Sequence, residues 1–290
     1  MSAKKILVTG ANGQLGKEIQ VLASAYAQYE FVFADRTILP IEQQSKVNEF
    51  FSQVKPFACI NCAAYTAVDK AESEKDRANE VNADAVSFLA EACSTHRALF
   101  IHISTDYVFD GTSSIPYKEE DDTDPVNHYG RSKLFGEKRA MEKNPSSIIV
   151  RTSWVYSEFG NNFVKTMMRL MKERESLNVV SDQIGSPTYA ADLAKAIMKI
   201  ITQHEGSSSI KEGIYNYSNE GTLSWYDFAI AIKELTGSAC KVNPIPTSQY
   251  PTPAKRPHYS LLDKSKIKST FQIEIPDWKE SLKICLKRLK

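Results

Sequence analysis

Hydrophobic positions in the first half of the chain alternate between short continuous runs and longer stretches with helical spacing. The continuous runs predict strands at 5–9, 30–34, 58–63, 99–104 and 147–152. The stretches between them predict helices at 14–27, 45–55, 76–97 and 129–142. Strands that alternate with helices of this length indicate a parallel sheet with helices on both faces. We therefore expect an α/β fold over residues 1–152, with a doubly wound, Rossmann-like parallel sheet.

The second half has a looser pattern. It predicts helices at 163–174, 190–203, 224–235 and 278–289, separated by stretches rich in glycine, proline and serine. Residues 244–257 are dense in proline, but Tyr250 and Arg256 interrupt them, which favours an ordered binding loop over a flexible linker. We expect residues 153–290 to form mostly a smaller, loop-rich domain, with segments at about 189–217 packing back on the first domain.

Composition and charge exclude several classes of partner. Lys and Arg together number 36, against 35 Asp and Glu, so the chain has no electrostatic signature of a nucleic-acid or membrane-surface protein. Its apolar runs are far shorter than the ~20 residues that a membrane span requires. The first residues lack the apolar core of a secretory signal. We expect a cytoplasmic protein with no nucleic-acid or membrane partner.

Cysteine and histidine spacing gives little sign of a metal or redox site. Cys59 and Cys62 form a C-x-x-C pair inside a predicted strand, where positions three apart point to opposite faces. No second pair accompanies them, and the five histidines are scattered. Core packing is therefore the favoured role for both thiols, and no metal site is expected.

A glycine-rich loop follows the first predicted strand and opens the first helix. Its spacing is G-x-x-G-x-x-G, which suits a tight turn and a close approach of the backbone to a diphosphate. The exposed N–H groups of the helix start would bind that anion. The alternative is a glycine-rich turn with no ligand. As a dinucleotide loop, it makes cofactor-binding candidates of Gly10, Asn12, Gly13, Gln14, Leu15 and Gly16.

The end of the second predicted strand bears on the choice of cofactor. Asp35 lies where an acid accepts hydrogen bonds from ribose hydroxyls, which favours NADH. Arg36 follows it, and arginine pairs with the 2′-phosphate of NADPH. Both are present, so NADPH and NADH both remain open, and either residue could also be ordinary surface charge.

Tyr129 and Lys133 are four residues apart on a predicted helix and so lie on one face. A lysine ammonium near a tyrosine favours the phenolate, so we expect Lys133 to lower the pKa of Tyr129 and allow proton exchange with a carbonyl or hydroxyl group. A solvated surface pair is the alternative. Thr105 ends the fourth predicted strand, where its hydroxyl could bind the reacting oxygen or merely cap a turn.

Longer blocks of sequence then support a resemblance to a known family. They are 61–72 (NCAAYTAVDKAE), 104–111 (STDYVFDG), 129–133 (YGRSK), 151–156 (RTSWVY), 182–188 (DQIGSPT) and 253–257 (PAKRP). Together they resemble the extended short-chain dehydrogenase/reductase superfamily and, within it, the dTDP-4-dehydrorhamnose reductase family. The blocks follow the family's order over nearly the whole chain.

The resemblance implies reduction of the C4 ketone of dTDP-4-dehydro-L-rhamnose by NADPH or NADH, the last step in making dTDP-L-rhamnose. Tyr129 would donate the proton, Lys133 would activate it and bind the cofactor ribose, and Thr105 would hold the carbonyl oxygen. Further cofactor-binding residues would be Ala63, Ala64 and Tyr65. In the substrate-binding second half and the loops near it, the implied substrate-binding residues are Val68, Thr105, Asp106, Tyr107, Trp154, Asn162, Gln183 and Arg256. Trp154 has core packing as its alternative role.

Two positions differ from the family pattern. Many relatives carry an aspartate that touches adenine after the second strand, where this chain has Pro40. Some relatives dimerise through a glutamate-bound magnesium ion, and the corresponding position here is Ala191. We therefore expect no metal-bridged dimer, and a monomer or weak homodimer instead.

Several related functions share this fold. Tyr107 stands where nucleotide-sugar dehydratases have an acid, and Asp106 stands where GDP-fucose synthases have a cysteine. The 4-epimerases lack the blocks at 151 and 182 in this form. Another nucleotide-sugar reductase or epimerase remains an alternative, as does a non-catalytic NADP-binding subunit like that of methionine adenosyltransferase. The intact set of Thr105, Tyr129 and Lys133 favours an enzyme.

Overall fold

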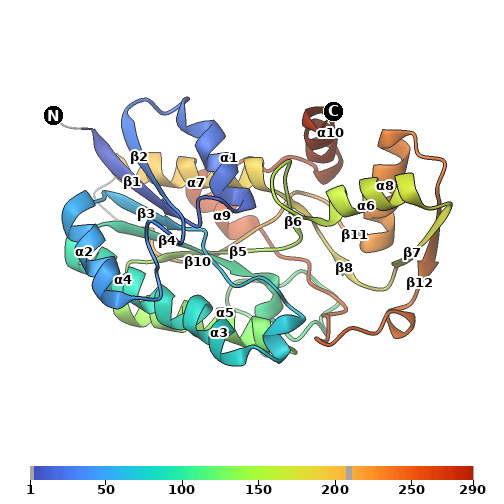
Figure 1. The fold of residues 1–290 in the computed structure, drawn as a ribbon, viewed down its shortest axis with the longest axis horizontal. Helices are drawn as coiled ribbons and strands as arrows, with labels where there is room; N and C mark the ends of the chain where they lie inside the picture. Colours follow the sequence, from blue (N-terminus) through green and yellow to red (C-terminus); the bar gives the residue numbers. More distant parts are fainter. Residues whose placement is uncertain (1–2, 207–210, 290) are drawn as a thin grey trace.

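The computed structural model describes residues 3–206 and 211–289 and contains a six-stranded parallel sheet with helices on both faces (Figure 1). The strand order is β2-β1-β3-β4-β5-β10, so the chain reverses direction across the sheet between β1 and β3. The strands are β1 (Lys4–Thr9), β2 (Tyr29–Ala34), β3 (Ala58–Asn61), β4 (Leu99–Thr105), β5 (Ile148–Thr152) and β10 (Gly213–Tyr217). The doubly wound α/β prediction is confirmed.

Side chains along each central strand enter two different hydrophobic cores. On β1, Ile6 and Val8 pack on the face covered by three helices, α1 (Gln14–Ala23), α7 (Ala190–Glu205) and α9 (Ser265–Phe271). Leu7 packs on the opposite face, under α2 (Gln44–Val54), α4 (Ala85–His96) and α5 (His128–Lys143). Because both faces are buried, these strands have continuous apolar runs in place of alternation.

The two thiols of the C-x-x-C pair also divide between these faces. Cys59 belongs to the core under α2 and α4, whereas Cys62 packs against the core on the other face. Both cysteines are free. The prediction that they point apart is therefore confirmed.

The long helix predicted at 76–97 is interrupted in the structure. It consists of α3 (Lys75–Asn79), a wide π-helical turn η2 (Glu80–Asp84) and then α4. Helix α5 packs so closely here that a Cβ atom on Gly136 would overlap the carbonyl oxygen of Asn82. The π turn places Asn82 between α5 and the loop after β3, with which it forms hydrogen bonds.

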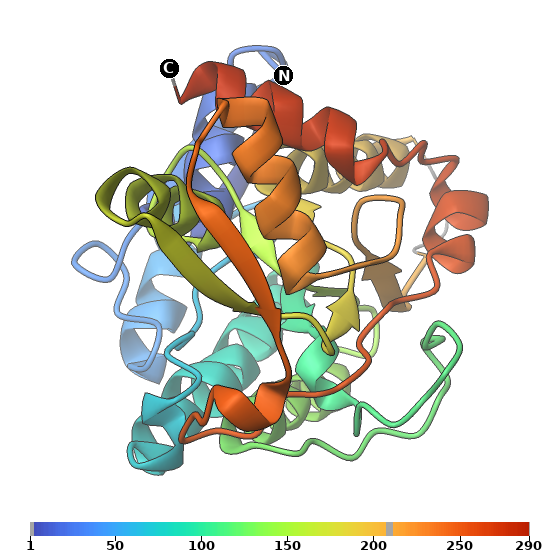
Figure 2. The ribbon, with the colours of Figure 1, turned by 90° about the vertical axis from the view of Figure 1, so that its right-hand side faces the viewer.

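The smaller part of the molecule lies to the right of the large sheet in Figure 1 and has a separate hydrophobic core. The parallel pair β7 (Ser176–Val180) and β12 (Lys241–Ile245) lies beside α6 (Phe163–Glu173) and α8 (Trp225–Thr236). Helix α10 (Trp278–Arg288) crosses α8 and packs against it (Figure 2). Short pairings complete it: β6 (Val155–Tyr156) with β9 (Thr188–Tyr189), and β8 (Ile184–Gly185) with β11 (Leu223–Ser224). The helices match the predicted ones, but the short strands were not predicted.

Three segments from the second half of the chain, α7, β10 and α9, pack back on the large sheet. Helix α7 packs against α1, and β10 extends the sheet by pairing with β5 in parallel register. Helix α9 then covers β10, with Phe271 of α9 against Tyr215 of β10. The sheet thus takes its sixth strand from sequence beyond residue 152.

The proline-dense segment is ordered and packed, as predicted. Ala254 is fully buried, and its backbone N–H donates to Asp69. The guanidinium of Arg256 donates from two nitrogens to the same carboxylate, each across 2.9 Å. Among residues 3–206 and 211–289, no helix has both the length and the apolar character needed to cross a membrane.

Candidate active site

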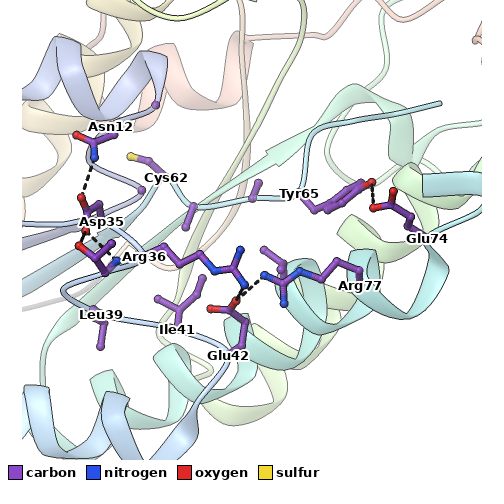
Figure 3. A pocket seen from close by; sticks show the side chains of 16 residues that line it. Asn12, Asp35, Arg36, Leu39, Ile41, Glu42, Cys62, Tyr65, Glu74 and Arg77 are labelled. Atoms are coloured by element: carbon purple, nitrogen blue, oxygen red, sulfur yellow. Dashed lines mark hydrogen bonds and ion pairs between the residues drawn. The ribbon is translucent and has the colours of Figure 1, made fainter. Parts of the chain in front are cut away.

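A cavity of about 640 Å³ opens at the carboxyl ends of β1, β2 and β3 (Figure 3). This is the point where strand order reverses, and open α/β sheets bind ligands there. Its lining comes from the three loops after these strands and from the helix beside them: Gly10, Asn12, Gly13, Asp35, Arg36, Thr37, Leu39, Ile41, Glu42, Cys62, Ala63, Ala64, Tyr65, Glu74, Arg77 and Val81.

The glycine loop brings backbone to the cavity wall in a way that side chains would prevent. Gly10 has φ +64°, and a Cβ there would lie 2.5 Å from the backbone nitrogen of Ala63. Helix α1 begins just after Gly13. Glycine has no side chain, so it cannot accept a hydrogen bond from the first backbone N–H groups of the helix. Uncapped amides at a helix start are suited to an anion. The loop therefore fits a diphosphate.

Asp35 is held by its neighbours at the end of β2. Its Oδ2 accepts from the Asn12 amide across 2.8 Å, and its Oδ1 accepts from the backbone and hydroxyl of Thr37. The Thr37 hydroxyl, followed by backbone N–H groups, lowers the pKa of Asp35. An ionised carboxylate on the cavity wall is suited to accept hydrogen bonds from ribose hydroxyls.

Two arginines share one carboxylate at the cavity (Figure 3). The Glu42 Oε1 atom lies 3.2 Å from the guanidinium of Arg36 and 2.6 Å from that of Arg77, which approach it from opposite sides. Against the effect of burial, the hydrogen bond from Arg77 lowers the pKa of Glu42. Arg77 also pairs with Glu80 in the next turn. Arg77 was not predicted as a site residue, because it belongs to no sequence motif and reaches the cavity only through packing.

The loop around Pro40, which differs from the family pattern, forms one wall of the cavity. Leu39 and Ile41, on either side of Pro40, are almost fully buried and line the cavity. An apolar wall beside ribose-binding groups fits the flat face of an aromatic base.

Thr105, Tyr129 and Lys133 lie outside the lining of this cavity. Thr105 ends β4, where its hydroxyl donates to Asp106 Oδ1 across 3.0 Å and accepts from the backbone N–H of Tyr107. The ring of Tyr129 meets that of Tyr107 edge to face, with centroids 5.7 Å apart. The close approach depends on the next residue, since a Cβ on Gly130 would overlap the carbonyl oxygen of Tyr107.

Asn82 connects the helix of Tyr129 to the cavity wall. Its Oδ1 accepts from the backbone N–H of Tyr65 across 2.8 Å, and its Nδ2 donates to the Ser132 hydroxyl across 2.9 Å. Tyr65 lines the cavity, and Ser132 lies next to Lys133 on α5. Asn82 was not among the predicted site residues, because it belongs to no local sequence pattern.

The expected effect of Lys133 on Tyr129 is wrong for this arrangement of side chains. Burial raises the pKa of Tyr129 to about 12, although a hydrogen bond with Thr105 opposes the rise. The Lys133 ammonium group points into the sheet instead, where Nζ donates to the carbonyl of Ile103 across 2.6 Å and lies 3.2 Å from His102 Nε2. Burial lowers the pKa of Lys133 to about 8.

Asp106 is a further buried acid beside the phenol. It is 2% exposed, and its Oδ2 has no hydrogen-bond partner among the described residues. Burial raises its pKa to about 7. A buried carboxyl with a free oxygen, next to Thr105 and Tyr129, is able to bind a polar group of a ligand.

The chain as a whole matches one family model and a series of named relatives. The model described as the RmlD substrate binding domain matches residues 4–290. A dTDP-4-dehydrorhamnose reductase of Aggregatibacter actinomycetemcomitans is 45% identical over 285 residues, which cover 96% of this chain and 97% of the relative. The chain belongs to the dTDP-4-dehydrorhamnose reductase family.

Solved structures of this reductase family have the same fold. The crystal structure of a dTDP-4-dehydrorhamnose reductase from Clostridium acetobutylicum has a TM-score of 0.93, with 44% identity, and covers 98% of this chain and 99% of its own. That from Bacillus anthracis, solved in complex with NADP, has a TM-score of 0.94, with 39% identity, and covers 99% of this chain and 100% of its own.

The residues predicted to bind the cofactor divide between the cavity and its surroundings. Those that line the cavity are Gly10, Asn12, Gly13, Asp35, Arg36, Ala63, Ala64 and Tyr65. Those outside its lining are Gln14, Leu15, Gly16, Tyr129 and Lys133. Leu15 packs in the hydrophobic core, and Gly16 packs against the backbone of the glycine loop. Gln14 faces the second half of the chain.

Two of the amide side chains predicted to bind the substrate have structural partners. Asn162 caps α6 by accepting from the backbone N–H of Lys165, and its Nδ2 donates to Gln14 Oε1 across 2.9 Å. Gln183 is 9% exposed and donates to the Thr247 hydroxyl across 3.1 Å. These contacts join segments that are distant in sequence.

The remaining substrate candidates lie on the loops after β3 and β5 and on the proline-dense segment. Val68 immediately precedes Asp69, whose pKa is lowered by the hydrogen bonds from Arg256. Trp154 has φ +48° and stacks on Trp225, with ring centroids 3.7 Å apart. Its indole thus packs against the second core while remaining partly exposed. Within residues 3–206 and 211–289, no cluster of three or more His, Cys, Asp or Glu could hold a metal ion.

Proposed function

We propose that this protein reduces the C4 ketone of dTDP-4-dehydro-L-rhamnose to dTDP-L-rhamnose with NADPH or NADH. One juxtaposition supports the proposal above all others. A cavity built from the glycine loop is connected through Asn82 to α5, the helix that carries Tyr129 and Lys133, in a chain of the reductase family. The enzyme class rests on the same observation.

The residues of the cavity fit a nicotinamide dinucleotide. The loop from Gly10 to Gly13 and the start of α1 would hold the diphosphate, Asp35 the adenosine ribose, and Leu39 and Ile41 the base. When bound, the nicotinamide supplies the hydride that reduces the ketone.

The side chains at the end of β4 and on α5 would supply the proton to the ketone oxygen. Tyr129, with its pKa near 12, keeps its proton at neutral pH and so has one to give to the ketone oxygen. The Thr105 hydroxyl would hold that oxygen, and Lys133 would stabilise the phenolate that remains. Val68, Asp106, Tyr107 and Trp154 would contact the sugar, and Asn162, Gln183 and Arg256 the nucleotide end.

Arg36 and Arg77 favour NADPH over NADH within this proposal. Their guanidinium groups converge on Glu42 at the cavity wall, close to the carboxylate that would hold the ribose. Two guanidinium groups so placed could bind a 2′-phosphate from both sides. The cytoplasmic location and the monomeric or weakly dimeric state remain predictions.

A direct assay tests the proposed reaction. Purified protein would be mixed with dTDP-4-dehydro-L-rhamnose and either NADPH or NADH, and the loss of nicotinamide absorbance followed. We expect turnover with the dTDP sugar and little with the GDP-linked keto-sugar. Tight NADPH binding without turnover of either sugar would favour the non-catalytic binding subunit instead.

A further inference from the structure

The side chain of Glu42 lies between two arginines on the wall of the cavity at the glycine loop (Figure 3). The residue belongs to the loop between β2 and α2, and its side chain is 9% exposed. Its Oε1 atom lies 3.2 Å from Nη2 of Arg36 and 2.6 Å from Nη2 of Arg77. One carboxylate oxygen thus bridges two guanidinium groups from separate segments of the chain.

Both terminal nitrogens of Arg77 are paired with carboxylates. Its Nη2 donates to Glu42 Oε1, and its Nη1 donates to Glu80 Oε2. The side chain of Arg36 is 74% exposed and forms its ion pair with the same Glu42 oxygen. An anion that approaches both arginines from the cavity must therefore compete with the Glu42 carboxylate for their N–H groups.

A 2′-phosphate would compete for this place. In the proposed function Asp35 holds the adenosine ribose, and Arg36 is the next residue, so a group on the ribose 2′-oxygen would meet the Arg36 guanidinium. Phosphate and carboxylate oxygens accept the same charge-assisted hydrogen bonds from a guanidinium group. The two anions cannot occupy the same place between the arginines.

The Glu42 carboxylate is ionised at neutral pH. Burial favours its neutral acid, but the hydrogen bond from Arg77 and the charges of both arginines lower its pKa below the usual value. A phosphate monoester carries about −1.5 to −2 charge at pH 7, so the two anions repel each other. NADH has a neutral hydroxyl group in place of the phosphate and meets no such repulsion.

We propose that Glu42 is a residue that determines cofactor specificity. Its carboxylate occupies the place of a 2′-phosphate between Arg36 and Arg77, and so weakens the binding of NADPH while leaving that of NADH nearly unchanged. The two arginines attract the 2′-phosphate, and Glu42 offsets part of this attraction. The cavity thus accepts both cofactors with similar affinity.

This inference rests on the cofactor part of the proposed function, but its test needs no sugar substrate. Failure of the reductase assay leaves the affinities for NADPH and NADH measurable. If neither cofactor binds the parent protein, the proposed function and this inference are both wrong. If both bind and a change of Glu42 leaves the ratio of their affinities the same, only this inference is wrong.

The decisive variant is Glu42→Gln, which removes the charge but keeps the size of the side chain and an oxygen that accepts from Arg77. Dissociation constants for NADPH and NADH would be measured by nicotinamide fluorescence at one fixed salt concentration. We expect NADPH to bind about tenfold more tightly than to the parent, and NADH to change by less than about twofold. Weaker binding of NADPH would show that Glu42 positions the arginines for the phosphate, and would overturn the proposal.

Two further measurements keep the proposal testable if this variant does not fold. Glu42→Ala also removes the carboxylate and should change the NADPH affinity in the same direction, with circular dichroism to verify the fold. In the parent protein, the dissociation constants for NADPH and NADH should differ by less than about tenfold. A preference for NADPH of more than about a hundredfold would contradict the proposed offset.

Glu74→Gln is the matched control for the loss of a negative charge at the cavity. Glu74 also lines the cavity, but it accepts from the Tyr65 hydroxyl across 2.8 Å. In the part of the chain that the structure describes, no ion pair joins it to Arg36 or Arg77. We expect a much smaller change in the ratio of NADPH to NADH affinity. An equal change in both variants would show that the general field of the cavity, and not the place of Glu42, determines the preference.

Two fragments of the cofactors locate the effect on the 2′-phosphate. Adenosine 2′,5′-bisphosphate and 5′-AMP differ only in this group, and each would be titrated as a competitor of NADH. We expect Glu42→Gln to tighten the bisphosphate about tenfold and to leave 5′-AMP nearly unchanged. An equal effect on both fragments would contradict competition between Glu42 and the 2′-phosphate.

Discussion

Arg151 and Glu137 form a buried ion pair directly behind the end of β4. The Arg151 Nη2 atom lies 2.7 Å from Glu137 Oε2, and both side chains are at most 3% exposed. The same carboxylate accepts from Ser104, next to Thr105, so the pair helps to fix the strand end at the candidate site. A charge buried this deeply depends on its partner.

Removing one partner of this pair should destabilise the fold strongly. Arg151→Met leaves the Glu137 carboxylate buried without a counter-ion, which costs about 3–5 kcal/mol in the free energy of unfolding. The measurement is urea unfolding at neutral pH. As the control, Arg151→Met with Glu137→Leu should recover much of the loss. If the single variant is as stable as the parent, the pair is not a structural requirement.

Tyr129→Phe should abolish most of the reductase activity. The substitution removes only the phenolic oxygen, so the proton for the ketone is lost while the packing against Tyr107 is kept. We expect turnover to fall by about 10²–10⁴-fold. NADPH affinity, measured by nicotinamide fluorescence, should change little. Turnover near that of the parent would exclude Tyr129 as the proton donor.

Arg77→Gln should weaken NADPH selectively. The variant removes one of the two guanidinium groups at Glu42, so the dissociation constant for NADPH should rise about tenfold, as expected for one lost charge-assisted contact, while that for NADH stays nearly constant. Fluorescence titration with each cofactor measures both constants. Arg169→Gln is a matched control, since Arg169 pairs with Glu173 on the exposed surface of α6. Equal weakening of both cofactors would contradict a 2′-phosphate contact.

Gly10→Ala should prevent cofactor binding. Its Cβ would overlap backbone atoms of Ala63 at the cavity wall, and φ is +64°. Gly237→Ala is the control, because φ is +69° there but no atom lies within 4 Å of the added Cβ. We expect both variants to lose about 1 kcal/mol of stability from the backbone conformation, and Gly10→Ala to lose more because of the overlap with Ala63. Only Gly10→Ala should lose NADPH binding, and a variant at this position with normal affinity would argue against the diphosphate site.

Glu18 should make the fold less stable as pH rises. Burial, and then the neighbouring Glu158, raise the pKa of Glu18 from 4.5 to about 8. The folded state thus holds a proton that the unfolded chain releases, so stability falls between pH 4.5 and about pH 8. Glu18→Gln keeps a hydrogen-bond acceptor for Ser157 and should make this decline shallower. Urea unfolding at pH 5 and pH 8 tests it, and identical slopes in both proteins would contradict the assignment.

Local patterns in the sequence predicted the parallel sheet, most of its covering helices and the glycine loop, but not helix α9. These features follow from local periodicity, because the backbone geometry of helices and strands sets the spacing of buried side chains. The strand β10 was not predicted from these patterns. Its five residues, Gly213–Tyr217, include polar positions, and they join the sheet only because α7 returns the chain to β5.

The contacts between side chains of distant segments depend on the tertiary structure. The spacing of Tyr129 and Lys133 placed them on one helix face, but the packing of α5 against β4 directs the lysine to His102 and Ile103. Likewise, Arg77 reaches Glu42 from a separate helix. A local sequence pattern constrains the backbone conformation of a residue. The side chain that this residue contacts depends on how distant segments pack in a common core, so the neighbouring sequence does not predict the contact.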